Sequence, residues 1–372
     1  MISRADAARA LALATLGALF VDVEPALAPA IGRGFGLDSA SLGAILGLES
    51  LAAIAGGAVT LALVKAIGYR NLAVAAPLLY VASNVATASA SSTAMLAVLR
   101  AATGVTEGVM LALAFAALSR TNDTHRLFAW FGITQTLSAV VAFPVVTWLL
   151  VTYGWRAPFV AIAIVGVVVL LTAIPSFEAM PQAQRLALRD VQPAGLLSIF
   201  LFFTAQCAVW PFLERIGASR GVSDALLGGG LSVGALCGFA GSAVVASLPS
   251  KLSGWRAWII AGALNAAAIL VLALSPSPAI FIAGLGAFNF AWALFAPLQL
   301  HALKQLGAST ATFALASTAT NAGFAAGPLL GGILFHQSGE AAALAAGIAG
   351  TPLALAILVP SKYNSKRLTA TQ

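Results

Sequence analysis

Twelve long apolar runs, separated by short segments that hold most of the charged residues, constrain this chain more than any other feature. The runs cover 8–32, 41–64, 72–90, 93–118, 127–151, 157–174, 193–214, 224–247, 256–273, 279–304, 310–335 and 341–360. An α-helix needs about 20 residues to cross the hydrocarbon core of a bilayer, and each run is close to that length. We therefore expect twelve membrane-spanning helices.

The composition excludes a water-soluble protein. Hydrophobic residues make up 60% of the chain and charged residues only 8%, whereas about 25% of a typical soluble domain is charged. The runs are apolar on all sides and lack the alternation of a β-barrel strand. We therefore predict an all-α membrane protein, with too few residues left over for a domain outside the membrane.

The positive charges predict the orientation. Of the 19 Lys and Arg, four (Arg33, Arg156, Arg215 and Arg220) fall in the expected outer loops and Arg100 falls in a span, which leaves 14 for the inner loops and termini. Positive residues near span ends stay cytoplasmic. We expect a bacterial-type cytoplasmic (inner) membrane with both termini cytoplasmic. The excess of positive charge then needs no nucleic-acid partner.

The two halves of the chain resemble each other. The segment 36–43 (GLDSASLG) aligns with 221–228 (GVSDALLG), and 65–70 (KAIGYR) aligns with 251–256 (KLSGWR). A repeat of six spans enters the membrane twice in the same orientation. We predict an N-terminal six-helix bundle at 1–174, a cytoplasmic linker at 175–192 and a C-terminal six-helix bundle at 193–372.

Four local patterns resemble those of the major facilitator superfamily. Residues 100–108 (RAATGVTEG) are similar to its Arg-x-x-x-Gly pattern, and 327–332 (GPLLGG) to its Gly-Pro-x-x-Gly-Gly motif. Residues 154–156 (GWR) resemble a common turn of the family. The loop near Gly68 resembles part of a further motif, with Lys65 at the acidic position. In many antiporters of the family the Gly-Pro motif lies in the fifth span, where this chain has 142–145 (AFPV).

This resemblance implies a fold and a mode of action. It implies two pseudo-symmetric bundles that rock about a midplane cavity lined by the first, fourth, seventh and tenth spans. It also associates Arg100 with proton coupling. The expected function is secondary transport by alternating access, with a small-molecule substrate and protons as partners, in a monomer. No cofactor and no metal are expected.

Five ionisable residues lie at the depth of the hydrocarbon core. A charged side chain there is unfavourable in free energy unless it is paired or in contact with water. The five residues are Asp22, Glu24, Glu49, Arg100 and Glu107. At 1.5 Å per residue, Asp22 and Glu107 lie within roughly 3 Å of the midplane and the other three about 5 to 8 Å toward the outside. Depth alone therefore makes Glu24 and Glu49 the nearest partners of Arg100.

Four carboxyl groups cannot all stay ionised beside one guanidinium in a low-dielectric interior. At least one is expected to bind a proton reversibly, which would couple transport to a proton gradient. The alternative is a static Arg100 ion pair that only holds helices together. Asp22 and Glu24 lie about 200° apart around a helix, so they cannot both face one cavity unless Pro25 distorts the turn. Asp22 is the expected cavity-facing acid.

The C-terminal half supplies aromatic and amide side chains instead of charges. With Asp22, the predicted substrate-binding residues are Phe203, Gln206, Trp210, Phe288, Asn289, Trp292, Phe295 and Gln299. Aromatic faces attract apolar groups and cations. This set predicts an amphipathic organic substrate that is cationic or carries a ring. Lipid-facing or interhelical packing remains the alternative for each aromatic residue.

An enzyme is not expected. Two G-x-S-x-G matches, at 217–221 and 230–234, lack the preceding strand that a nucleophile elbow requires. No phosphate-binding loop occurs, so ATP is not the expected energy source. We expect proton-coupled transport with a lean to efflux by antiport. The alternatives are proton-coupled uptake of a nutrient or aromatic metabolite, and a transport-inactive membrane sensor or assembly factor.

Overall fold

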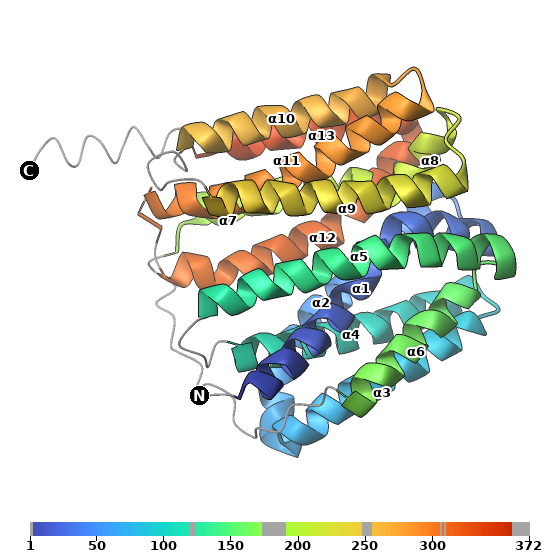
Figure 1. The fold of residues 1–372 in the computed structure, drawn as a ribbon, viewed down its shortest axis with the longest axis vertical. Coiled ribbons are helices and arrows are strands. Elements are labelled where there is room, and N and C mark those ends of the chain that lie inside the picture. Colours follow the sequence, from blue (N-terminus) through green and yellow to red (C-terminus); the bar gives the residue numbers. More distant parts are fainter. Residues whose placement is uncertain are drawn as a thin grey trace, which may run out of the picture. The chain divides into compact units, whose positions relative to one another are not determined.

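The fold was taken from a computed structural model that describes residues 3–118, 124–172, 191–247, 255–305, 307–308 and 310–358. Within these residues the regular structure is helical throughout, without a strand (Figure 1). The predicted linker at 175–192 lies outside the described residues except for its last two positions.

Six helices form the N-terminal part, one for each of the first six apolar runs. They are α1 (Arg4–Phe35), α2 (Ser39–Ile67), α3 (Tyr69–Ala88), α4 (Thr93–Leu118), α5 (Thr124–Tyr153) and α6 (Ala157–Thr172). Ser3 caps the start of α1 by accepting a hydrogen bond from the Asp6 N–H. The helix then continues through Pro25 and Pro29 and ends at the left-handed Gly36.

The C-terminal part contains α7 (Pro193–Val209), the 3₁₀ helix η2 (Trp210–Phe212), α8 (Leu213–Ala218), α9 (Asp224–Ser247), α10 (Trp255–Leu274), α11 (Pro278–Gln305), α12 (Thr310–Ser338) and α13 (Glu340–Ala356). The seventh predicted span is therefore not one continuous helix. Pro211 has no N–H to donate to the preceding turn, which explains the break inside this span.

The contacts divide the chain into two compact units, Met1–Ala183 and Gln184–Gln372. The same helix pairs form in both. In the first unit α2 packs against α4, α3 against α6 and α1 against α5. In the second, α9 packs against α11, α10 against α13 and α7 against α12. The predicted class, an all-helical protein of two pseudo-symmetric six-helix bundles, is confirmed.

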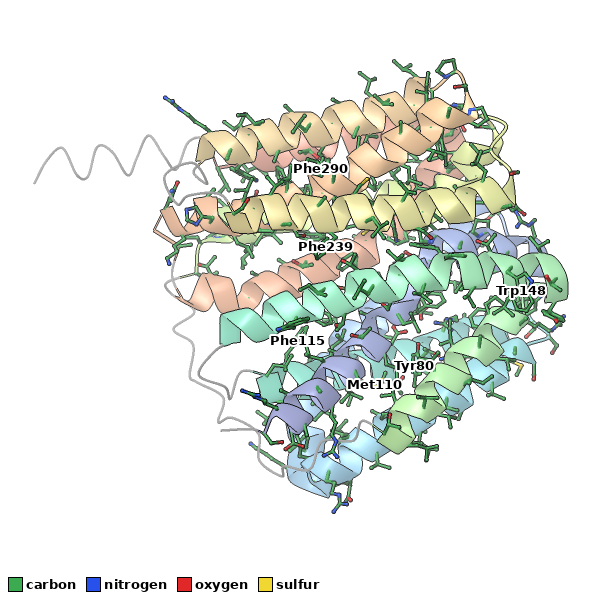
Figure 2. All side chains as sticks on the ribbon, in the orientation of Figure 1. Tyr80, Met110, Phe115, Trp148, Phe239 and Phe290 are labelled. Carbon is green, nitrogen blue, oxygen red and sulfur yellow. The ribbon has the colours of Figure 1, made fainter. Side chains whose placement is uncertain are left out.

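The outer surfaces of the helices are apolar. Nine described helices are long and apolar enough to cross a membrane, and α6 and α13 are shorter apolar helices. Large side chains such as Leu171, Leu274 and Val98 are more than two-thirds exposed, and apolar side chains project from the helices all along the protein (Figure 2). An aqueous surface does not carry so much exposed apolar area. The chain is an integral membrane protein.

Three glycines let α2 and α4 approach backbone to backbone. A Cβ atom added at Gly56 would overlap the Val105 carbonyl oxygen. Added at Gly104 or Gly108, it would overlap the carbonyl oxygen of Glu49 or Ala53. Small residues at such spacing are a common means of close packing between membrane helices.

We predict that Gly56→Ala destabilises the protein and that Gly57→Ala does not. The Gly56 substitution forces α2 and α4 apart, which should cost about 1–3 kcal/mol. At the adjacent Gly57 a Cβ would meet the Gly108 carbonyl oxygen at 3.6 Å, an ordinary contact. Thermal unfolding of the purified variants measures the difference. Equal melting temperatures would contradict the close approach.

Candidate functional site

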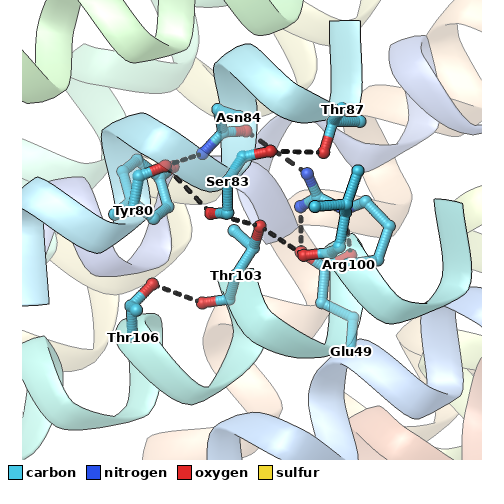
Figure 3. Close-up of polar contacts among 9 residues, drawn as sticks. Glu49, Tyr80, Ser83, Asn84, Thr87, Arg100, Thr103 and Thr106 are labelled. Atoms are coloured by element: carbon cyan, nitrogen blue, oxygen red, sulfur yellow. Dashed lines mark hydrogen bonds and ion pairs between the residues drawn. The ribbon is translucent and has the colours of Figure 1, made fainter. Parts of the chain in front are cut away.

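Arg100 of α4 lies at the centre of the N-terminal unit, and its side chain is completely buried. Its Nε donates to Glu49 Oε2 of α2 at 2.9 Å, and its Nη2 donates to the other oxygen of the same carboxylate. Figure 3 shows this two-pronged pair. Parallel hydrogen bonds of this kind fix both the distance and the orientation of the two groups.

Three further helices contact the same guanidinium. Nη1 donates to Asn84 Oδ1 of α3 at 3.3 Å, and the Asn84 amide donates in turn to the Tyr80 carbonyl oxygen at 2.9 Å. The Phe20 ring of α1 lies 3.9 Å from the guanidinium carbon, and the Phe159 ring of α6 lies 5.4 Å from it. Arg100 therefore joins α1, α2, α3 and α6 to α4.

Hydroxyl groups connect α3 and α4 beside this pair (Figure 3). Thr103 Oγ1 donates to Ser83 Oγ at 2.8 Å, and Ser83 donates to the Tyr80 carbonyl oxygen at 3.0 Å. Thr106 donates to the Thr103 carbonyl oxygen at 2.6 Å. These hydroxyl groups donate to one another or to backbone carbonyl oxygens. Their hydrogen atoms are therefore not available to a further carboxylate.

Two more carboxyl groups lie close enough to interact electrostatically with the pair. Glu24 of α1 and Glu107 of α4 are both buried, and each interacts with Glu49 and Arg100. Oε1 of Glu107 has no hydrogen-bond partner among the described residues, and the same holds for the Tyr80 hydroxyl. We call Glu24, Glu49, Arg100 and Glu107 the Arg100 cluster.

Asp22 has a different hydrogen-bond partner from the members of the Arg100 cluster. Its Oδ1 accepts a hydrogen bond of 2.9 Å from Gln135 Nε2 of α5, while its Oδ2 is buried without a partner among the described residues. The structure thus directs Asp22 and Glu24 to different neighbours. Gln135 was not identified from the sequence, because an amide within an apolar run does not reveal which helix it faces.

In the C-terminal unit, four of the predicted aromatic residues form one group. Trp292 of α11 packs edge-on against Trp210 and Phe288 at ring-centroid distances of 5.7 and 5.6 Å, and against Phe203 at 6.3 Å. Phe324 of α12 extends the group, 5.3 Å from Phe203. The sequence analysis missed Phe324, which occurs in a helix that was not expected to line the cavity. We call these five residues the aromatic group.

The other predicted substrate-binding residues of this unit contact different neighbours. Gln206 bonds to Asn265 of α10, Gln299 donates to Ser198 at 2.8 Å, and Phe295 stacks on Phe202 at 4.0 Å. Asn289 donates to the Leu285 carbonyl oxygen of its own helix. A buried amide without a partner is costly, so Gln206 and Gln299 turn toward the polar groups inside the bundle.

Comparison with known proteins agrees with this architecture. The sequence matches the family model of the Major Facilitator Superfamily over residues 10–316, most of the chain. The structure resembles a mutant of the nucleoside transporter NupG, with a TM-score of 0.70 and 12% identity over 96% of this chain and 99% of that one.

Two further solved structures are also similar. One is the D-xylose-proton symporter, with a TM-score of 0.75 and 16% identity over 94% of this chain and 97% of that one. The other is a bacterial homologue of the human lysosomal transporter Spinster, with a TM-score of 0.64 and 15% identity over 97% and 96%. At these identities the likeness shows a shared fold.

We predict that Arg100 and Glu49 depend on each other for stability. Arg100→Met or Glu49→Met alone leaves the other charge buried and unpaired, which should cost about 3–5 kcal/mol. The double variant should lose clearly less than the sum, because no unpaired charge remains. Detergent-induced unfolding of all four proteins measures this coupling.

The Arg220–Glu340 pair is a matched control, since both side chains are partly exposed and their nearest atoms are 2.6 Å apart. Arg220→Met should cost at most about 1 kcal/mol. Additive losses for Arg100→Met and Glu49→Met would show that the buried pair makes no specific contribution.

Proposed function

The chain belongs to the major facilitator superfamily, and on that premise we propose that it is a proton-coupled secondary transporter of a small amphipathic organic solute. Its fold is the fold of transporters, and its helices are those of an integral membrane protein. The driving force, the solute class and the direction of transport are proposals that we base on the two groups of residues described above.

The observation that carries this proposal is the surplus of carboxyl groups in the Arg100 cluster. Arg100 donates hydrogen bonds from Nε and Nη2 to Glu49 and from Nη1 to Asn84. Glu24 and Glu107 are buried in the same region without a second cation among the described residues. An uncompensated buried charge costs several kcal/mol. A proton on one of these groups removes that cost, and access to water restores the charge.

Protonation of this cluster is able to change how the helices pack. When Glu107 or Glu24 loses its proton, a second negative charge competes with Glu49 for the guanidinium. Because Arg100 contacts α1, α2, α3 and α6 as well as its own helix, a change of partner alters several helix contacts at once. A buried pair with two alternative arrangements is the kind of bistable element that a rocking-bundle transporter requires.

The aromatic group and Asp22 support an organic solute that is cationic or carries a ring. Flat faces of Trp and Phe bind both apolar groups and cations. Trp292, Phe203 and Phe324 remain partly exposed, whereas Trp210 and Phe288 are buried, so the first three rings are the accessible ones of the group. We propose that the solute contacts these rings.

For direction we propose export by proton antiport, supported by the acidic residues of the N-terminal unit. Proton-coupled uptake is the second candidate, because the Gly-Pro-x-x-Gly-Gly motif that many antiporters carry in the fifth span is replaced here by 142–145 (AFPV). We further propose a monomer in a bacterial-type cytoplasmic membrane. The distribution of Lys and Arg supports cytoplasmic positions for both termini.

Solute flux in proteoliposomes under an imposed pH gradient tests the coupling, after a thermal-shift screen across pH has identified a solute that binds. Antiport predicts accumulation on the proton-rich side, and symport predicts accumulation on the proton-poor side. A final distribution that ignores the gradient would rule out proton coupling. Binding without flux in either direction would favour the sensor alternative.

We predict that Glu107→Gln abolishes gradient-driven accumulation but retains exchange of labelled for unlabelled solute at equal pH. Exchange does not require net proton release, whereas accumulation does. Glu340→Gln, which removes a charge from the C-terminal unit, is the matched control and should transport as the original protein does. Unchanged accumulation in Glu24→Gln, Glu49→Gln and Glu107→Gln alike would exclude the Arg100 cluster as the coupling site.

We predict that Trp292→Leu weakens solute binding by about threefold to tenfold, the effect of losing one aromatic contact of roughly 0.5–1.5 kcal/mol. Trp148→Leu is the control, because the Trp148 side chain of α5 is more than half exposed on the outer surface of its helix. Titration of the identified solute against both variants gives the dissociation constants. Equal affinities would exclude Trp292 from the binding site.

A further inference from the structure

We propose that Phe20 of α1 is a positioning residue for Arg100, and that its ring holds the guanidinium in place by a cation–π contact when Glu49 becomes neutral. The inference deepens the proposed function, on which the use of this contact in transport rests. It also gives a role to the turn at 154–156 (GWR), which the proposed function leaves unused.

The Phe20 ring covers a face of the guanidinium that the hydrogen bonds leave open. The guanidinium carbon lies 3.9 Å from the centroid of the ring, well inside the roughly 6 Å over which a cation and an aromatic face attract each other. The hydrogen bonds to Glu49 and Asn84 are made at the edge of the planar group. The edge contacts and the face contact therefore restrain Arg100 in different directions.

Burial strengthens this contact. Phe20 is 2% exposed and Arg100 is 0% exposed, so bulk water does not screen the attraction between them. A cation–π contact is stronger when both groups are desolvated. Its strength also depends on the positive charge of Arg100, which the carboxylate of Glu49 offsets while the ion pair is intact. The ring therefore contributes most when Glu49 is neutral.

Phe159 of α6 contacts both members of the cation–π contact. Its ring centroid lies 6.4 Å from that of Phe20, with the two rings nearly parallel at 22°, and 5.4 Å from the guanidinium carbon of Arg100. Phe159 is itself completely buried. It limits movement of the Phe20 ring away from Arg100 and adds a second, longer aromatic contact to the cation.

Trp155, in the turn between α5 and α6, completes the aromatic series. It lies edge-on to Phe159 at 6.2 Å and contacts Phe35, the last residue of α1, at 4.9 Å. A Cβ atom added at Gly34 would overlap the Trp155 indole. Helix α1 is thus packed against the same aromatic series at Phe20 and at its end, which fixes the rotation of the helix and keeps the Phe20 ring over the guanidinium.

Fluorinated phenylalanine at position 20 tests the contact with little change in the size of the ring. Each fluorine atom withdraws electron density from the aromatic face and weakens its attraction for a cation. Phenylalanine with one, two or three fluorine atoms is introduced into the full-length protein, and unfolding in detergent is measured. We expect a stepwise loss of stability that reaches about twofold to thirtyfold in the unfolding equilibrium constant with three fluorine atoms.

The same series is measured in two further variants. Glu49→Gln keeps the shape of a neutral glutamic acid, and we expect a steeper loss per fluorine atom there than in the original protein. The double variant Arg100→Met with Glu49→Met lacks the cation, and we expect the dependence on fluorine to disappear. Phe281 of α11, buried against Gly217, is the matched control position and should respond equally in all three proteins.

Three results would overturn the inference. Equal slopes with and without Arg100 would show that the Phe20 ring only fills space. A slope in Glu49→Gln no steeper than in the original protein would show that the ring does not replace the carboxylate as a partner. A Glu49→Gln protein that does not fold would show that the ring cannot hold the cation without an ionised Glu49.

These measurements do not depend on transport, so they separate the inference from the proposed function. A solute distribution that ignores the pH gradient would remove the proposed coupling and leave the fluorine dependence unchanged. Gradient-driven accumulation together with equal slopes would support the coupling and exclude Phe20 as the residue that positions Arg100.

Discussion

The two-pronged pair of Arg100 and Glu49 is the interaction on which the N-terminal unit depends. The helices that carry it, α2 and α4, lie unusually close. Gly104, one turn after Arg100, permits this, since a Cβ there would overlap the carbonyl oxygen of Glu49 itself. The backbone of Glu49 therefore takes part in the close packing of the two helices, and its side chain takes part in the ion pair. Any change of partner for Arg100 is also a change at the tightest helix contact of this unit.

The C-terminal unit repeats this helix packing without the Arg100–Glu49 pair. With the 185-residue offset that aligns 36–43 with 221–228, Glu49 corresponds to Gly234 and Gly104 to Asn289. These two residues also meet, since a Cβ on Gly234 would approach Asn289 Nδ2. The glycine lies on α4 in the first unit and on α9 in the second. The larger side chain lies on α2 in the first unit and on α11 in the second. A neutral network of Gln206, Asn265 and Thr351 supplies buried polar contacts between α7, α10 and α13.

The fold was predictable because a membrane helix is defined mainly by the length of its apolar run. The run at 93–118 coincides with α4, and depth along the helices placed Arg100 level with Glu49. Rotation about each helix axis was not predictable, because packing decides it. Gln206 and Gln135 both looked like lone amides in apolar runs. One completes a network inside the bundle, whereas the other faces an acid.

Stability alone does not account for the acids of the N-terminal unit. A buried ion pair contributes little more than well-packed apolar residues of the same volume, and each unpaired carboxyl group near it is a further cost. Glu24 and Glu107 add that cost to a pair that Arg100 already satisfies. The proposed proton coupling gives this surplus a use, because the charge state of the cluster then changes during transport. Helix α1 contributes Asp22 to a contact with Gln135 of α5 and Glu24 to the Arg100 cluster.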